Sequence, residues 1–217
     1  MAPLLSRSAH GRRMASDRLA FYQILRGRRS VRRFDPEPIE REVLLRLIES
    51  ATLAPSAHNS QPWRFALLTD PEVRRRLGWA MGEAFRSDLM LDGRSPEEIE
   101  RAVRRSRERL EQAPVAIVIA LSMRDANQYA DGRRQNAEHT MAVQGAALAA
   151  ENLLLAAHAE GLGGCWLCSP LFCPDLVSRE LSLPGDWEPS GMVLLGRPAG
   201  PAAPRERHPL VEVTVWR

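Results

Sequence analysis

The sequence contains no lysine, so all 30 of its basic residues are arginine. A chain without a lysine amine cannot form a Schiff base, hold pyridoxal phosphate or build a P-loop. It also has no apolar run near the roughly 20 residues that a membrane-spanning helix needs. Residues 1–16 lack the apolar core of a signal peptide, and we expect them to be a disordered leader. These absences predict a cytoplasmic protein without a membrane partner.

Cysteine is scarce, with three residues at positions 165, 168 and 173. Cys165 and Cys168 form a Cys-x-x-Cys pair, but a zinc site needs four ligands and no second pair stands near them. A redox pair of this spacing should open a helix, whereas these two lie in an apolar run that is typical of a strand. We therefore interpret them as buried structural thiols and expect no metal.

Charge is nearly balanced, because 30 basic and 27 acidic residues give a net charge of +3. Between residues 94 and 109 the arginines alternate with glutamates, which favours a solvated helix face. The alternative for this stretch is a positively charged lid over an acidic substrate. A nucleic-acid-binding protein would gather its cations on one face, so we expect a small anionic molecule as partner and no nucleic acid.

One run departs from this balance: Arg28-Arg29-Ser30-Val31-Arg32-Arg33-Phe34 places four arginines and a hydroxyl in seven residues. Cations this close repel one another unless water screens them or an anion lies among them. Guanidinium groups bind phosphate through paired hydrogen bonds, and a serine hydroxyl adds a further donor. The run therefore predicts either a solvated basic turn or a phosphate-binding site.

Hydrophobic periodicity, caps and breakers predict alternating helices and short strands. The expected helices span residues 17–27, 40–53, 71–112 with a break at 91–96, 136–160 and 175–181. The expected strands span residues 64–68, 114–121, 165–169, 190–195 and 211–216. Ser95 and Glu98 form a capping box after the break. This layout indicates one α+β domain over residues 17–217.

The helix expected over residues 136–160 carries alanine or glycine on nearly every side. Small side chains allow close packing against several neighbours, so this helix would suit a subunit interface. The last strand follows a proline-rich segment, residues 197–209, that is long enough to leave the body of its own subunit.

Four motifs, in order along the chain, resemble those of the FMN-dependent nitroreductase family. They are Arg28-Arg29-Ser30-x-Arg32-x-Phe34, Pro55-Ser56-x-x-Asn59-x-Gln61-Pro62-Trp63, Gly161-Leu162-Gly163-Gly164-Cys165-Trp166, and Gly196-Arg197-Pro198 followed by Arg207-His208-Pro209-Leu210. The resemblance implies a mostly antiparallel central sheet wrapped by helices. It also implies FMN bound at a homodimer interface and a C-terminal strand exchanged between the subunits.

The same resemblance implies a set of FMN-binding residues. In chain order they are Arg28, Arg29, Ser30, Arg32, Pro55, Ser56, Asn59, Cys168, Ser169, Leu171, Gly196, Arg197, Arg205 and Arg207. The first three and the last two would hold the phosphate, and Arg32 would place a cation at the pyrimidine edge, which favours the reduced flavin. The residues from 55 to 59 would come from the second subunit, where the Asn59 amide offers both a donor and an acceptor.

The resemblance further implies that a strand over residues 168–171 passes beside flavin N5, the reacting atom. The sequence departs from the family pattern here, because Pro170 has no N–H. The donor to N5 is therefore expected from either Ser169 or Leu171.

Within the family the likeness extends to the C-terminal reductase domain of FbiB, an enzyme of coenzyme F-420 biosynthesis. It rests on Arg86-Ser87-Asp88-Leu89, Tyr129-x-Asp131-x-Arg133-Arg134 and Leu183-Pro184-x-Asp186-Trp187-Glu188-Pro189. It implies hydride transfer from reduced FMN to the anionic deazaflavin precursor dehydro-F-420-0. Tyr129, Arg133 and Arg134 are then candidate anchors for that substrate.

Two other functions stay open at this point. The first is a general reductase of nitroaromatics or quinones that uses NAD(P)H as electron donor. The second is a flavin- or deazaflavin-binding protein without turnover.

Overall fold

A four-stranded antiparallel sheet is the centre of the fold. The structure, a computed structural model, describes residues 5–217, and for residues 5–13 and 15 it describes the backbone alone. The strands are β1 (Trp63–Leu68), β2 (Val115–Leu121), β3 (Gly163–Leu167) and β4 (Glu188–Gly196). Their order is β1-β2-β4-β3, and every neighbouring pair is antiparallel. The predicted α+β class and antiparallel sheet are confirmed.

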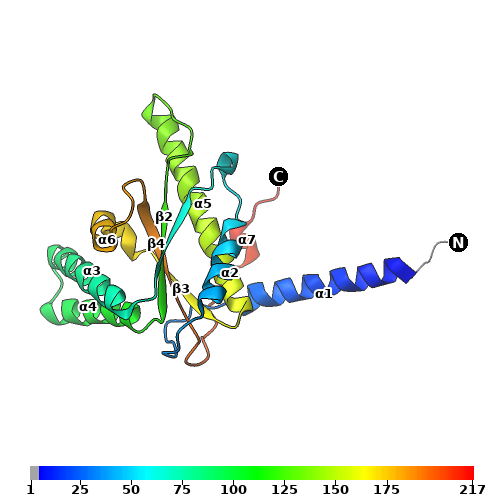
Figure 1. The fold of residues 1–217 in the computed structure, drawn as a ribbon, viewed down its shortest axis with the longest axis horizontal. Helices are drawn as coiled ribbons and strands as arrows, with labels where there is room; N and C mark the ends of the chain where they lie inside the picture. The colour runs from blue at the N-terminus through cyan, green and yellow to red at the C-terminus, as the bar shows by residue number, and fades with distance from the viewer. Residues whose placement is uncertain (1–4) are drawn as a thin grey trace.

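Helices cover both faces of this sheet (Figure 1). On one face lie α2 (Arg41–Thr52) and the long α5 (Gly132–Ala159). On the other lie α3 (Pro71–Leu91), α4 (Pro96–Glu111) and the short α6 (Pro174–Leu181). Because β2 is central and covered on both sides, every one of its residues is buried, as its continuous apolar sequence predicts.

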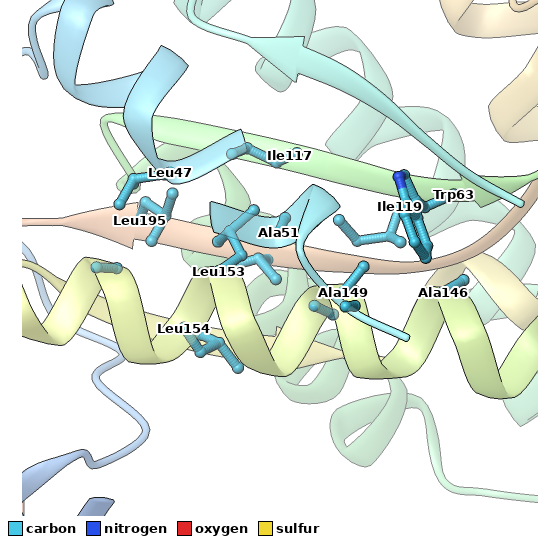
Figure 2. Close-up of a cluster of buried hydrophobic side chains, with 14 of the residues drawn as sticks. Leu47, Ala51, Trp63, Ile117, Ile119, Ala146, Ala149, Leu153, Leu154 and Leu195 are labelled. Carbon is cyan, nitrogen blue, oxygen red and sulfur yellow. The ribbon is translucent and has the colours of Figure 1, made fainter. Parts of the chain in front are cut away.

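Alternate residues of β2 point into two separate cores. Ile117 and Ile119 pack against Leu47 of α2 and Leu153 of α5, which Figure 2 shows. Val118 points to the opposite core under α3, α4 and α6. This two-residue period follows from the pleat of a strand, and it fixes which helices each face can hold.

Helix α5 is the most buried helix of the fold. By length and composition alone it is apolar enough to cross a membrane. In the structure it is a core helix, and its residues Ala149, Leu153 and Ala157 are fully buried. It begins at Gly132, earlier than the predicted residue 136, because the Asp131 carboxylate caps it by accepting a hydrogen bond from the Arg134 N–H (2.9 Å).

The break between α3 and α4 agrees with the prediction. Pro71–Leu91 and Pro96–Glu111 are separate helices, and Ser95 with Glu98 forms the expected capping box. The two backbone N–H groups that the box satisfies would otherwise lack partners at the helix start, which is why this short motif fixes the boundary.

The two ends of the chain differ from the prediction. Helix α1 (Leu5–Gly27) begins well before residue 17, so residues 5–16 of the expected leader are helical, and it projects from the body as an arm (Figure 1). The strand predicted over residues 211–216 is wrong, because the chain forms a short helix, α7 (Leu210–Val213), there. A strand needs a neighbour, and in the described chain Val211 and Trp216 are exposed rather than paired.

Candidate functional site

The arginine run of residues 28–33 is held by its backbone between β3 and the C-terminal segment. The Val31 N–H donates to the Gly164 carbonyl (2.9 Å), and the Ala199 N–H donates to the Arg33 carbonyl (3.1 Å). The backbone is thus fixed on two sides without using the arginine side chains. They are left available to bind a ligand.

Gly163 of β3 permits this close approach. A Cβ atom at this position would lie 2.7 Å from the side chain of Val31, far closer than two carbon atoms pack. Any larger residue at position 163 would therefore push the arginine run away from the sheet. Gly163 thus gives the glycine motif of the sequence a packing role.

Six arginines converge on a cavity of about 230 Å³, which we call the basic cavity. They are Arg28, Arg29, Arg32, Arg33, Arg205 and Arg207. Ser30, Val31 and residues 200–203 complete its lining, and no carboxylate is among the described residues that form it. The structure thus brings together residues that the sequence placed in the phosphate site from both ends of the chain.

The positive charge of the basic cavity is mostly unneutralised. Arg28 forms a salt bridge with Glu151 of α5 (Nε to Oε1, 3.4 Å). Arg29 donates from Nη1 to the carbonyl of Arg28 (2.8 Å). Within residues 5–217, Arg32 and Arg207 form no salt bridge. A phosphate dianion fits such a cluster, because guanidinium–phosphate hydrogen bonds are about twice as strong as neutral ones.

A second cavity, of about 280 Å³, adjoins the basic cavity, since Arg28 and Ser30 line both. We call it the slot. Trp166 of β3 forms part of its wall, and one face of α5 forms the rest. The α5 residues follow helical spacing and are Ala147, Ala150, Glu151 and Leu154. Two alanines keep this wall thin, so a flat ring system fits against it while its phosphate lies among the arginines.

The segment after β3 is a 3-10 turn, η2 (Ser169–Phe172), so the strand expected over residues 168–171 is wrong. Proline favours this turn, because its fixed φ suits the first helical positions. In the turn the Leu171 N–H donates to the Cys168 carbonyl (3.0 Å). The Ser169 N–H has no hydrogen-bond partner within residues 5–217. Of the two donors that the sequence left open, Ser169 is therefore the available one.

The three thiols have different environments. Cys165 is buried and Cys173 half-buried, and burial raises the pKa of both thiols. Cys168 is exposed, and the Trp166 Nε1–H donates to its Sγ (3.0 Å). The interpretation as buried thiols is therefore wrong for Cys168. In the described part of the chain, no group of three or more His, Cys, Asp or Glu side chains is placed to hold a metal ion.

The loop of residues 55–62 lines neither the basic cavity nor the slot. It packs on α5, where a Cβ at Gly145 would lie 3.5 Å from the Cβ of Ser56. The Ser56 hydroxyl accepts a hydrogen bond from the Gln61 N–H (3.0 Å). Three residues have positive φ, a strain that costs about 1–3 kcal/mol each and is common at functional sites. They are His58, Asn59 and Gln61.

The candidate substrate anchors Tyr129, Arg133 and Arg134 also lie outside both cavities. Arg134 forms an ion pair with Asp131 and lies over the ring of Tyr129, 4.9 Å from its centroid. These contacts stabilise the start of α5. Arg134 is thus occupied within its own subunit, while Arg133 forms no salt bridge among the described residues.

Two predicted contacts take other positions, and one lining residue was missed. Gly196 is buried at the end of β4, and Arg197 pairs with Glu37 (3.0 Å). In contrast, Glu151 lines the slot although the sequence analysis gave it no role, and Arg33, which belonged to the predicted arginine run but not to the implied FMN-binding set, lines the basic cavity. The spacing of small residues around Glu151 on one face of α5 was the available signal for the slot.

Residues 25–197 match the model of the nitroreductase family. This span contains the arginine run, the slot and the whole sheet. The chain belongs to the nitroreductase family. As a flavin oxidoreductase of that family, it has in the basic cavity and the slot a set of residues that fits FMN.

Named relatives of this nitroreductase-family chain cover most of its length. It is 32% identical over 187 residues to 5,6-dimethylbenzimidazole synthase of Rhodospirillum rubrum (86% of this chain, 82% of the relative). It is 30% identical over 216 residues to NADH dehydrogenase of Thermus thermophilus (88% and 92%). A Desulfovibrio desulfuricans protein described as a nitroreductase in complex with FMN matches with TM-score 0.69 at 25% identity (91% and 96%). A BluB-like flavoprotein from Clostridium difficile shares the fold, with TM-score 0.75 at 21% identity (90% and 98%).

Proposed function

We propose that this protein is a homodimeric, FMN-dependent oxidoreductase that takes electrons from NAD(P)H and passes them through bound FMN to a small anionic acceptor. The observation that carries this proposal is the basic cavity with the slot beside it. FMN joins a phosphate dianion to a flat ring through a short hydroxylated chain. The arrangement of six arginines next to a thin alanine wall matches that combination of charge and shape.

Different residues bind different parts of the cofactor in this proposal. Arg28, Ser30 and Arg207 hold the phosphate, and Arg32 places a cation where it favours the reduced ring. The free N–H of Ser169 is the donor for flavin N5. Bound FMN supplies the redox chemistry, because it accepts two electrons from one substrate and gives them to another.

A second copy of the chain completes the site in this proposal. The α1 arm exposes Leu19 and Phe21 (61% and 56% of their surface), and the C-terminal segment exposes Trp216 (93%). Apolar side chains displayed on projecting segments are typical of association surfaces. Within one subunit, the loop of residues 55–62 does not reach the slot. In the dimer, a partner that covers these apolar side chains would bring its own loop to the slot of the first subunit.

For the acceptor we infer dehydro-F-420-0, on the likeness to the reductase domain of FbiB around residues 86–89, 129–134 and 183–189. A substrate with a phosphodiester and a carboxylate suits a chain whose unpaired cations are all arginine. Nitroaromatics and quinones are the second candidate, because the chain belongs to the nitroreductase family. NADH as donor is favoured by the relative named NADH dehydrogenase.

The test is anaerobic reduction of the FMN-loaded protein by NADH or NADPH, followed by each acceptor in turn. Return of the flavin absorbance with dehydro-F-420-0, with conversion of that compound, supports the proposal. Return only with quinones or nitroaromatics moves the function to the second candidate. Formation of 5,6-dimethylbenzimidazole would identify the activity of the first relative instead. A colourless protein that does not bind FMN would overturn the proposal as a whole.

The dimer has a separate test in light scattering of the FMN-loaded protein. We expect twice the mass of one chain. A monomer that binds FMN tightly would remove the shared site from the proposal and leave the reductase reaction standing.

A further inference from the structure

A third cavity, of about 490 Å³, lies between α3, α4 and η2 and is larger than the basic cavity or the slot. We call it the α3–α4 cavity. Its volume is within the roughly 300–1,000 Å³ of small-molecule sites. Met81 and Phe85 of α3 and Phe172 of η2 give it an apolar wall. A planar molecule has room to lie against these side chains.

Four charged residues at this cavity are without ion pairs. They are Asp88, Asp92, Arg105 and Arg109, and within residues 5–217 none of them is in a salt bridge. Three other arginines of α3 and α4 are paired: Arg104 with Glu108, Arg107 with Glu83 and Arg86 with Glu100. Asp88, Asp92 and Arg105 are exposed and Arg109 is half-buried, so water can solvate all four and a ligand with charged or polar ends can replace that water.

The α3–α4 cavity reaches the segment that we assign to flavin N5. Ser169, whose N–H has no partner, lines it, and Cys173 follows on the same turn. Turn η2 begins three residues after Trp166, which forms part of the slot wall. A molecule in the α3–α4 cavity would therefore lie beside the segment that we assign to flavin N5.

We propose that the α3–α4 cavity binds the electron acceptor, a flat ring with a carboxylate or phosphate at one end and hydrogen-bond donors at the other. Arg105 and Arg109 hold the anionic group, and Asp88 and Asp92 accept hydrogen bonds from the donors. The ring lies on the apolar wall. This inference rests on the proposed reductase function, because that function makes an acceptor site beside Ser169 necessary.

The experiment is calorimetric titration of the oxidised FMN-loaded protein with two probes of equal shape, 4-nitrobenzoate and its uncharged amide, 4-nitrobenzamide. We expect 4-nitrobenzoate to bind more tightly, and Arg105→Ala or Arg109→Ala to weaken it by about tenfold or more, as loss of a charge-assisted hydrogen bond implies. 4-Nitrobenzamide should bind the parent protein and the arginine variants with the same affinity. Arg104→Ala, one position away on α4 and paired with Glu108, is the matched control and should change neither probe.

A second variant tests the space rather than the charge. Ala102 of α4 lines the cavity, and Ala102→Phe should abolish binding of both probes while the FMN content stays that of the parent protein. Failure of 4-nitrobenzoate to bind the parent protein, or equal losses for both probes in the arginine variants, would overturn the inference. So would binding that depends on Arg28 and Arg207 instead.

Turnover separates this inference from the proposed function. If 4-nitrobenzoate binds with the expected dependence on Arg105 but is never reduced, the cavity assignment stands and the reductase assignment to nitroaromatics fails. If both probes are reduced at rates that Arg105→Ala and Ala102→Phe leave unchanged, the reductase function stands and the cavity assignment fails.

Discussion

Arginine is concentrated in two regions of this protein, the basic cavity and the α3–α4 hairpin, and its surroundings differ between them. On the hairpin, half of the arginines form salt bridges with glutamates. The pairs are Arg75 with Glu72, Arg76 with Glu180, Arg86 with Glu100, Arg104 with Glu108 and Arg107 with Glu83. Of the six arginines at the basic cavity, only Arg28 forms a salt bridge with another described residue, Glu151.

This difference shows that the number of arginines does not mark an anion site. The run over residues 94–109 holds six arginines, more than the four of residues 28–33. Paired arginines have their charge neutralised and form a solvated face, whereas unpaired ones repel one another until an anion binds. Arg105 and Arg109 follow the same rule within the hairpin, because both line the α3–α4 cavity and neither forms a salt bridge with a described residue.

Removal of two cations from the basic cavity tests the comparison most directly. Arg28→Ala with Arg207→Ala should weaken FMN binding at least about 100-fold, since each charge-assisted hydrogen bond contributes roughly 1.5–3 kcal/mol. Riboflavin, which lacks the phosphate, should bind both proteins alike. Quenching of flavin fluorescence measures both affinities. The paired Arg104→Ala is the control, and equal losses for FMN and riboflavin would contradict the phosphate assignment.

The position of the basic cavity can be disturbed without touching any charge. Gly163→Ala would place a Cβ against Val31, and overpacking of 1–3 kcal/mol predicts about a tenfold loss of FMN affinity together with a lower melting temperature. Val31→Ala in the same chain should restore binding. Gly132→Ala, where nothing lies within 4 Å of the added atom, is the neutral control. A loss that Val31→Ala does not relieve would contradict the packing argument.

Thiol reactivity sharpens the placement of the flavin. At pH 8 iodoacetamide should modify exposed Cys168 first, because the raised pKa values of Cys165 and Cys173 keep those thiols protonated. Their reaction should become faster only as the pH rises further, since the thiolate forms later than in an ordinary cysteine. Saturating FMN should slow modification of Cys168 several-fold, as mass spectrometry of the peptides would show. Equal rates with and without FMN would place the flavin elsewhere.

The smallest expected effect concerns the lone carboxylate. Glu151→Gln should tighten FMN binding about two- to fivefold at low salt, the range of a partly exposed charge interaction, because Arg28 then faces the phosphate alone. The gain should vanish at high ionic strength, where such interactions are screened. The control is Glu160→Gln at the C-terminal cap of α5, which removes the salt bridge to Arg46 of α2. Weaker binding at low salt would show instead that Glu151 orients Arg28.

Local sequence signals predicted much of the fold because their physics is local. The Ser95 capping box, the helix of residues 40–53 and the buried β2 each follow from hydrogen bonds or periodicity within a few residues. The wrong predictions concern segments whose conformation depends on a neighbouring strand or on the residues around them. Residues 211–216 have strand propensity but no neighbouring strand among the described residues, and the turn at Ser169 depends on Pro170 and the end of β3.

The candidate site likewise has features that follow from the sequence and features that depend on the fold. The sequence by itself determined the chemistry: a chain without lysine, a run of arginines around Ser30, and motifs that resemble an FMN-binding family. Only the tertiary structure decided which arginines stay unpaired, because that depends on which glutamates folding brings near them. It likewise joined Arg28 to Arg207 across the length of the chain and left the Ser169 N–H free, since long-range contacts and turn hydrogen bonds exist only in the folded state.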